Sequence, residues 1–201
     1  MKLDRKKAIE IIVKAAQNYE HNLKDKRFLI IYQGAKEAES VQVEFRGNHF
    51  LHLTGVKTKL SAQRFYEKCL NNKLALSDIE LDPKGRTQQK LAVLPFLHEL
   101  LYHNCMIGEF INSGIYIRAD YFVGNTKAVL SVGFRTGRRA DFPVTLYKED
   151  VRRLSNPTRK VLAILVKDHM QKVYSQYAYI SKGVDIQKLL MECKEERSML
   201  V

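Results

Sequence analysis

Apolar side chains recur at helical spacing in the first part of the chain and at strand spacing further along. Residues 3–24 carry apolar side chains three or four positions apart with charged residues between them, which predicts an amphipathic helix. The apolar run of residues 28–32 and the strict alternation of residues 41–45 predict two strands, each followed by a glycine-containing turn. The chain is therefore expected to begin with a helix and two strands.

The segment of residues 49–54 places two histidines and a threonine among apolar residues. Its alternation predicts a strand that forms a hairpin with the strand before it. Phe50, His52 and Thr54 would then lie on one face, with His52 and Thr54 side by side at a cleft. The alternative is that His52 is a half-buried structural histidine and that Gly55 only ends the strand.

Helices are expected in the middle of the chain and strands after it. Ser61 can cap one helix, and Thr87 can start another that Pro95 kinks or restarts. Strand-like runs separated by turn residues follow at residues 116–122, 128–134, 144–147 and 161–166. Because their connections are short, antiparallel pairing is favoured. We expect an α+β fold: a helical front half packed on a mostly antiparallel β-sheet, with a C-terminal helix at residues 186–193.

The 201 residues suit one substantial core. We expect an N-terminal helix over residues 1–25, a main domain over residues 26–182 and a C-terminal helix or tail over residues 183–201. No apolar run is long enough to span a bilayer, and no signal-peptide core is present. Three widely spaced cysteines favour reduced thiols, so a cytoplasmic protein is expected.

Positive charge is in large excess, with 34 Lys and Arg against 22 Asp and Glu and a formal net charge of +12. Such an excess attracts polyanions through their phosphates, which makes RNA or another nucleic acid the leading partner class. The alternative is a surface of solvated lysines, or a charged hairpin tip at residues 134–139. The candidate nucleic-acid-binding residues are Arg138, Arg139, Lys148, Arg152, Arg153 and Lys57.

Histidine, threonine, tyrosine and arginine side chains suffice for RNA cleavage without a metal. A base activates the ribose 2'-hydroxyl, an acid protonates the leaving oxygen, and cations stabilise the phosphorane. Because DNA lacks that hydroxyl, this chemistry selects RNA. The histidine spacings do not match a metal site and glycine-rich nucleotide loops are absent, so we expect no metal and no cofactor.

Three segments, at residues 48–56, 61–66 and 142–147, resemble the phage-associated branch of the barnase, EndoU, colicin and RelE-like (BECR) nucleases. The resemblance extends over residues 25–182 and implies a compact α+β domain. It also implies a metal-independent ribonuclease carried by phages, mobile elements or toxin systems.

The resemblance marks candidate catalytic positions at His52, Thr54, Arg135, Thr145 and Tyr147. The roles that we assign are general base or acid for His52, second proton transfer for His49 or Tyr147, phosphate binding for Arg135 and Arg138, and positioning for Thr54 or Thr145. A cognate inhibitor or a host ribonucleoprotein is a further possible partner.

Two other functions remain open. One is a noncatalytic, phage-derived protein that binds nucleic acid or inhibits a host defence; it predicts salt-sensitive binding without cleavage. The other is an ADP-ribosyltransferase, because a histidine two positions before a threonine on a strand is similar to the nucleotide-binding strand of that group. No convincing catalytic glutamate follows in the sequence.

Overall fold

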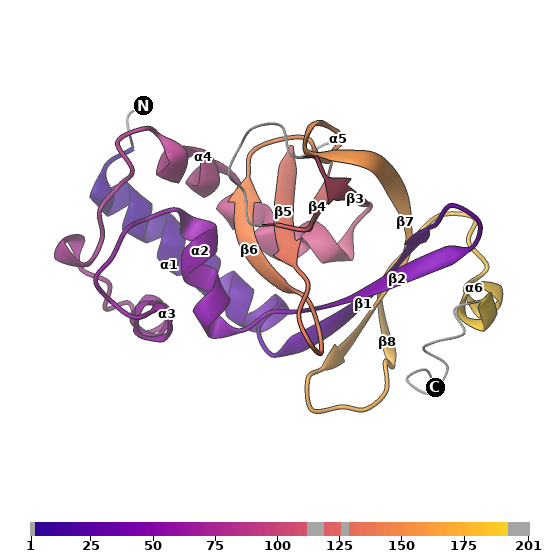
Figure 1. Cartoon of the computed structure of the whole chain (residues 1–201). Coiled ribbons are helices and arrows are strands. Elements are labelled where there is room, and N and C mark those ends of the chain that lie inside the picture. The colour runs from indigo at the N-terminus through magenta and orange to yellow at the C-terminus, as the bar shows by residue number, and fades with distance from the viewer. Residues whose placement is uncertain (1–2, 112–118, 126–128, 193–201) are drawn as a thin grey trace.

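A computed structural model describes residues 3–111, 119–125 and 129–192, which form helices packed against a curled antiparallel sheet (Figure 1). The helices, with the 3-10 helices labelled η, are α1 (Arg5–Asn22), η1 (Gly47–His49), α2 (Phe50–Thr54), α3 (Ala62–Leu70), η2 (Leu76–Asp78), α4 (Arg86–Val93), η3 (Leu94–Tyr102), α5 (Val151–Leu154) and α6 (Ile186–Glu192). The strands are β1 (Lys26–Gln33), β2 (Ala38–Glu44), β3 (Met106–Phe110), β4 (Tyr121–Asn125), β5 (Leu130–Arg135), β6 (Phe142–Tyr147), β7 (Ser155–Asp168) and β8 (Gln176–Ile180).

The sheet has the strand order β2-β1-β7-β3-β4-β5-β6, and β8 pairs with β7. Strand β7 is long enough to pair with β3 along its first half and with β1 along its second half. At the other end, the backbone N–H of Glu44 donates to the carbonyl of Asp141 at 2.8 Å, and the N–H of Asp141 donates to the carbonyl of Gln42 at 2.7 Å. This contact joins β2 to the residue preceding β6, so the sheet curls until its two ends meet.

The main core lies between the sheet and the helices of the front half. Tyr19 of α1 is buried at its centre, with edge-on ring contacts to Phe45, Phe50 and Tyr66. Helices α2 and α4 lie beside β6, whereas α6 lies at the opposite end of the molecule near β1 and β2 (Figure 1). The α+β class, the helical front half and the C-terminal helix are therefore confirmed.

Several predicted elements form at the expected places. Helix α1 begins after Asp4, whose carboxylate accepts the N–H of Lys7, and α3 begins after Ser61, whose hydroxyl accepts the N–H of Arg64. Helix α4 ends at Val93, and the 3-10 helix η3 follows with Pro95 in its first turn, as predicted. Of the expected later strands, residues 116–118 and 128 lie outside the described residues.

The predicted strand and hairpin at residues 49–54 are wrong, because the segment forms η1 and α2. Phe50, Leu53 and Thr54 are buried, the i, i+3, i+4 pattern of a helix face. Gly55 ends α2 in the left-handed conformation (φ 72°), a common end for a helix. The ADP-ribosyltransferase hypothesis thereby loses the strand on which it depended.

Helix α4 begins one residue earlier than predicted, at Arg86. Thr87 lies within its first turn, and its hydroxyl donates to the carbonyl of Gly55 at 2.7 Å and accepts the N–H of Asp82 at 2.9 Å. These bonds join the start of α4 to the end of α2. Their consequence is that the next turn of α4 lies against α2 and β6.

Cys69 and Cys105 are buried free thiols, and burial raises the pKa of each to about 12. Cys193 lies outside the described residues. Within the described part of the chain, no helix has the length and apolar character needed to cross a membrane.

Candidate active site

A basic pocket of about 430 Å³ lies between α4 and β6, and we call it the β6 pocket. Its lining residues are Arg86, Gln89, Lys90, Thr145, Leu146, Tyr147 and Lys148. Three of them are cationic, and none of the described lining residues carries a carboxylate. The structure therefore brings the predicted residues Thr145, Tyr147 and Lys148 together with two cations of α4 that sequence reasoning missed.

Lys90 lies at the centre of this arrangement. Its ammonium donates to the main-chain carbonyl of His52 at 2.8 Å and to the hydroxyl of Thr145 at 3.2 Å. Burial, with a smaller contribution from the positive charge of Arg86, lowers the pKa of Lys90 to about 8. It makes no ion pair with any described residue, so its charge is only weakly compensated by neutral oxygens.

Gly55 allows Lys90 to reach this position. A Cβ atom on Gly55 would come within 2.8 Å of Cδ of Lys90, and the positive φ of Gly55 disfavours other residues in any case. The glycine that ends α2 therefore also makes room for the Lys90 side chain.

Tyr147 is half-buried and lines one side of the β6 pocket. Burial raises the pKa of its hydroxyl, although Thr145 and Arg86 oppose this shift. The phenol therefore stays protonated at neutral pH and is suited to donating a hydrogen bond rather than to acting as a base.

A second, more open pocket of about 330 Å³ lies at the turn between β5 and β6, and we call it the arginine-turn pocket. Its lining residues are Glu44, Arg46, Asn48, His49, Gly137, Arg138, Arg139, Ala140 and Phe142. The turn is held by the N–H of Gly137, which donates to the carboxylate of Asp141 at 3.0 Å. The segment of residues 49–54 and the basic turn of residues 134–139 thus line the same pocket. The first contributes His49 and not His52.

One cation of the arginine-turn pocket is already neutralised. Arg46 pairs with Glu44 at 2.7 Å, and Glu44 also pairs with Arg27 at 3.0 Å. Burial alone would raise the pKa of Glu44, but the hydrogen bond from Arg27 and the charge of Arg46 lower it. Arg138 and Arg139 are exposed and make no ion pair within the described part of the chain, so they remain available to an anion.

His49 is held as a neutral imidazole. Burial and the nearby charge of Arg46 lower its pKa to about 4. Its Nδ1 accepts the backbone N–H of Arg46 at 3.2 Å, and its ring stacks on Phe142 with centroids 5.5 Å apart. Because Nδ1 is the acceptor, the hydrogen-bond network assigns the ring proton to Nε2. His49 is therefore better suited to donating a hydrogen bond than to accepting a proton.

His52 is exposed on α2, three residues after His49. On a helical segment this spacing places the two on the same side, whereas on a strand, where side chains alternate, they would lie on opposite faces. The electrostatic influence of His52 is a smaller cause of the lowered pKa of His49. The main-chain carbonyl of His52 accepts a hydrogen bond from Lys90, but His52 is not among the residues that line the β6 pocket.

Thr54 does not lie at a cleft beside His52, contrary to prediction. Its side chain is fully buried; the hydroxyl donates to the carbonyl of Leu51 at 2.8 Å and accepts the N–H of Val56 at 3.3 Å. Both bonds are local to the end of α2. Thr54 therefore shapes the helix end, and a substrate does not reach it in this structure.

The remaining predicted residues line neither basic pocket. Arg135 is exposed at the end of β5, and Lys57 is exposed beside its bridge to Glu80. Arg152 and Arg153 follow β6 on α5, where they pair with Asp150 at 2.6 Å and with Glu149 at 3.5 Å. The charges of α5 are thus largely compensated locally.

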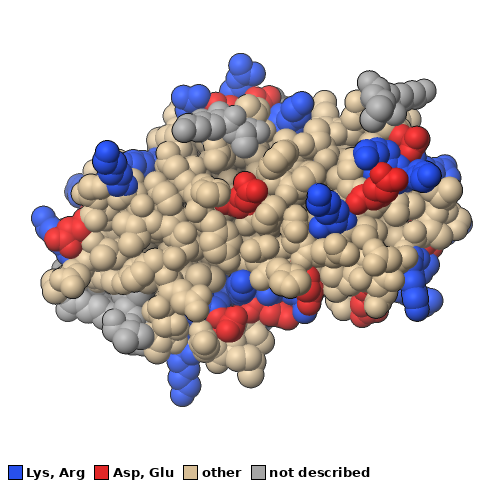
Figure 2. All heavy atoms as spheres, turned by 180° about the vertical axis from the view of Figure 1, so that it is seen from behind, with Lys and Arg blue, Asp and Glu red and all other residues tan. Residues whose placement is uncertain are grey.

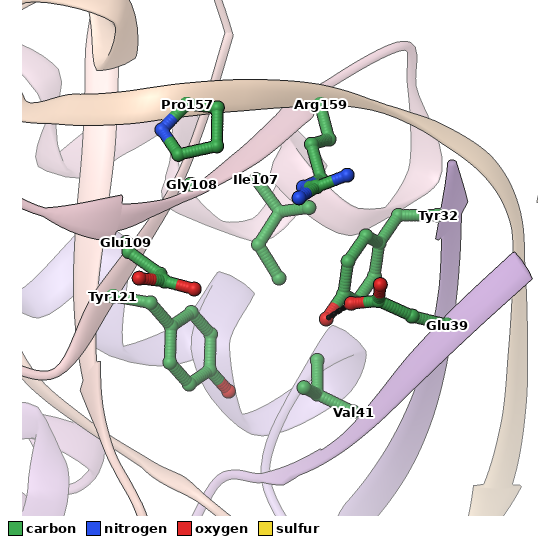
Figure 3. Close-up of a pocket in the computed structure, with 9 residues that line it drawn as sticks. All are labelled: Tyr32, Glu39, Val41, Ile107, Gly108, Glu109, Tyr121, Pro157 and Arg159. Atoms are coloured by element: carbon green, nitrogen blue, oxygen red, sulfur yellow. Dashed lines mark hydrogen bonds between the residues drawn. The ribbon is translucent and has the colours of Figure 1, made fainter. Parts of the chain in front are cut away.

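Charge is distributed differently elsewhere on the molecule. On the face opposite to that of Figure 1, Lys and Arg side chains are interspersed with Asp and Glu (Figure 2). A further pocket between the β1–β2 hairpin and β3 contains two carboxylates, Glu39 and Glu109, beside Arg159 and two tyrosines (Figure 3). The two carboxylates make this pocket a poor place for phosphate.

No metal site is apparent within residues 3–111, 119–125 and 129–192, where no group of three or more His, Cys, Asp or Glu side chains could hold an ion. That the protein works without a metal stays a prediction.

The chain was also compared with known proteins. It matches the profile of a family described as phage-Barnase-EndoU-ColicinE5/D-RelE like nuclease 4 over residues 11–183. Searches of curated proteins and of solved structures gave no significant match. The match extends from α1 to the residues after β8 and includes both basic pockets. The protein belongs to this phage-associated, BECR-type nuclease family.

Proposed function

We propose that the protein is a metal-independent endoribonuclease that binds RNA phosphates along β6. The nuclease family, the net charge of +12 and two basic pockets on one strand support this proposal. A toxin-like role for a phage or mobile element, in the cytoplasm, is part of the proposal. A cognate inhibitor would be its natural protein partner.

The observation that carries the proposal is the absence of a carboxylate among the described residues that line the β6 pocket. A half-buried ammonium costs free energy unless an anion or hydrogen bonds compensate it. Lys90 has two neutral acceptors, while Arg86 and Lys148 add positive charge. A phosphodiester would supply the missing negative charge and accept charge-assisted hydrogen bonds from all three cations.

Cleavage would proceed by attack of the ribose 2'-hydroxyl on the adjacent phosphorus. His52, which is exposed on α2 and whose main-chain carbonyl accepts a hydrogen bond from Lys90, is the proposed base, because an imidazole nitrogen can accept a proton. Arg86 and Lys148 would stabilise the charge of the phosphorane. The arginine-turn pocket would hold a neighbouring phosphate through Arg138 and Arg139.

The direct test is incubation of the purified protein with total cellular RNA in EDTA, beside His52→Ala. We expect the protein to cleave RNA under chelation, and the variant to lose turnover with little change in affinity. A circular dichroism spectrum of each protein controls for folding.

Intact RNA together with salt-sensitive binding by the folded protein would instead favour the noncatalytic, nucleic-acid-binding alternative. Cleavage that EDTA abolishes would contradict the metal-independent chemistry. Cleavage that persists unchanged in His52→Ala would remove His52 from its proposed role.

A further inference from the structure

Among the residues that the structure describes, two of the three ammonium protons of Lys90 have a hydrogen-bond acceptor. A lysine ammonium carries three N–H donors. Two of them are engaged by the His52 carbonyl on α2 and the Thr145 hydroxyl on β6, which fixes the position of the nitrogen. The third remains for a ligand in the β6 pocket, which Lys90 lines.

The surroundings of Lys90 also make its proton easier to remove. From α4, Arg86 and Gln89 face the same pocket; from β6, Tyr147 and Lys148 do. None of these is an acid that would hold the proton on Lys90. With a pKa of about 8, the amine is mostly protonated at pH 7 and yet more acidic than an ordinary lysine. Such a group is suited to general acid catalysis near neutral pH.

We propose that Lys90 is the general acid of RNA cleavage and protonates the 5'-oxygen that leaves phosphorus. This inference rests on the proposed ribonuclease function. The ribose 2'-oxygen forms a bond to phosphorus and passes its proton to His52, while the bond from phosphorus to the 5'-oxygen breaks. The proton of Lys90 moves to that oxygen. The products are a 2',3'-cyclic phosphate and a 5'-hydroxyl, and solvent restores the proton to Lys90.

The rival role for Lys90 is that of a fixed cation that only stabilises the phosphorane. Arginine distinguishes the two, because it keeps the positive charge and the donors but holds its proton far more tightly. The leaving group distinguishes them as well. A 4-nitrophenyl ester of uridine 3'-phosphate has a leaving group that needs no protonation, so its cleavage needs the base and the cations but not the acid.

The test compares the protein with Lys90→Met and Lys90→Arg on a dinucleotide and on this aryl ester. On the dinucleotide, both variants should lose about 10²- to 10⁴-fold in kcat, the usual contribution of a general acid. On the aryl ester, Lys90→Arg, which keeps the cation, should lose less than about tenfold. For the unsubstituted protein, kcat/KM on the dinucleotide should fall above about pH 8, with no such fall on the ester.

Lys36→Met is the matched control, since Lys36 is exposed between β1 and β2 and lines neither basic pocket. Melting temperatures check that the Lys90 variants fold. If Lys90→Met does not fold, the comparison of Lys90→Arg with the unsubstituted protein still tests the inference. Equal losses on both substrates, or full activity of Lys90→Arg on the dinucleotide, would overturn the inference. If the unsubstituted protein cleaves neither substrate, the ribonuclease proposal itself fails, and the inference fails with it.

Discussion

The β6 pocket and the arginine-turn pocket lie on the same strand and are both basic, but their charges are compensated differently. In the arginine-turn pocket, Arg46 is paired with Glu44, and His49 is held neutral. In the β6 pocket, Lys90 is half-buried against neutral oxygens, and no described lining residue is acidic. A count of cations therefore does not identify a reactive site. What matters is which cations lack a counter-ion and are partly removed from water.

The largest expected difference between the pockets is in turnover. Arg86→Ala should lower kcat on RNA by about 10²-fold, because it removes a cation that stabilises the transition state. Arg138→Ala should raise KM several-fold and leave kcat nearly unchanged, because it acts on binding. Steady-state kinetics on one RNA substrate measures both. Equal losses of kcat in the two variants would contradict the proposal that the β6 pocket carries out the reaction and the arginine-turn pocket only binds RNA.

The next effect is on the salt dependence of RNA binding. Substituting Arg138 and Arg139 together with alanine should reduce the slope of log K against log salt by about 0.7 for each phosphate that is no longer neutralised. The matched pair is Arg152 and Arg153, whose charges are compensated by Asp150 and Glu149. Their double alanine variant should leave the slope nearly unchanged. Fluorescence anisotropy with a labelled single strand at several salt concentrations gives both slopes, and similar slopes would contradict the distinction.

A smaller effect is expected on stability at alkaline pH. The pKa of Lys90 is lowered on folding, so the unfolded chain binds more protons between about pH 8 and the ordinary lysine pKa of 10.5. The free energy of unfolding should therefore rise with pH through this window, by up to about 3 kcal/mol. Lys90→Met should lack this rise and be the more stable protein below pH 8. Urea unfolding of both proteins across this pH range measures the difference, and parallel curves would show that Lys90 is not desolvated.

The smallest effect concerns His49 at acidic pH. Its pKa falls from 6.5 to about 4 on folding, so the unfolded chain binds the extra proton first as the pH decreases. His49 should therefore destabilise the fold progressively from pH 6.5 to about pH 4, by about 1–2 kcal/mol because its ring borders an open pocket. This destabilisation should be absent in His49→Gln. An NMR titration that finds His49 protonated at pH 6 would contradict its assignment as a neutral donor.

The secondary structure of long periodic segments could be predicted from the sequence, whereas that of the short segment of residues 49–54 could not. Helix α1 repeats its apolar spacing over several turns, and the alternation of β2 is unambiguous, so both were predicted correctly. In residues 49–54, apolar and polar positions fit a strand as well as a helix. The helix is selected by tertiary burial of Phe50 and Leu53 together with the left-handed end at Gly55.

The candidate site was partly predictable as well. The resemblance to the nuclease family marked Thr145 and Tyr147, the excess of positive charge marked Lys148, and the three lie close together in the sequence along and just after β6. Arg86 and Lys90 carry no local signal that separates them from the other basic residues of the chain. The hydrogen-bond partners of Lys90 are 38 and 55 positions away in the sequence, so only folding brings them together.

The sequence by itself determined the α+β class, the excess of positive charge and the resemblance to a nuclease family, because periodicity, composition and short motifs are properties of the chain. The tertiary structure decided which charges matter. It buried Thr54, paired Arg46, Arg152 and Arg153 with carboxylates, and placed Lys90 against two neutral oxygens. Desolvation and the identity of the nearest counter-ion arise from contacts between distant segments, and these set the chemistry of an ionisable group.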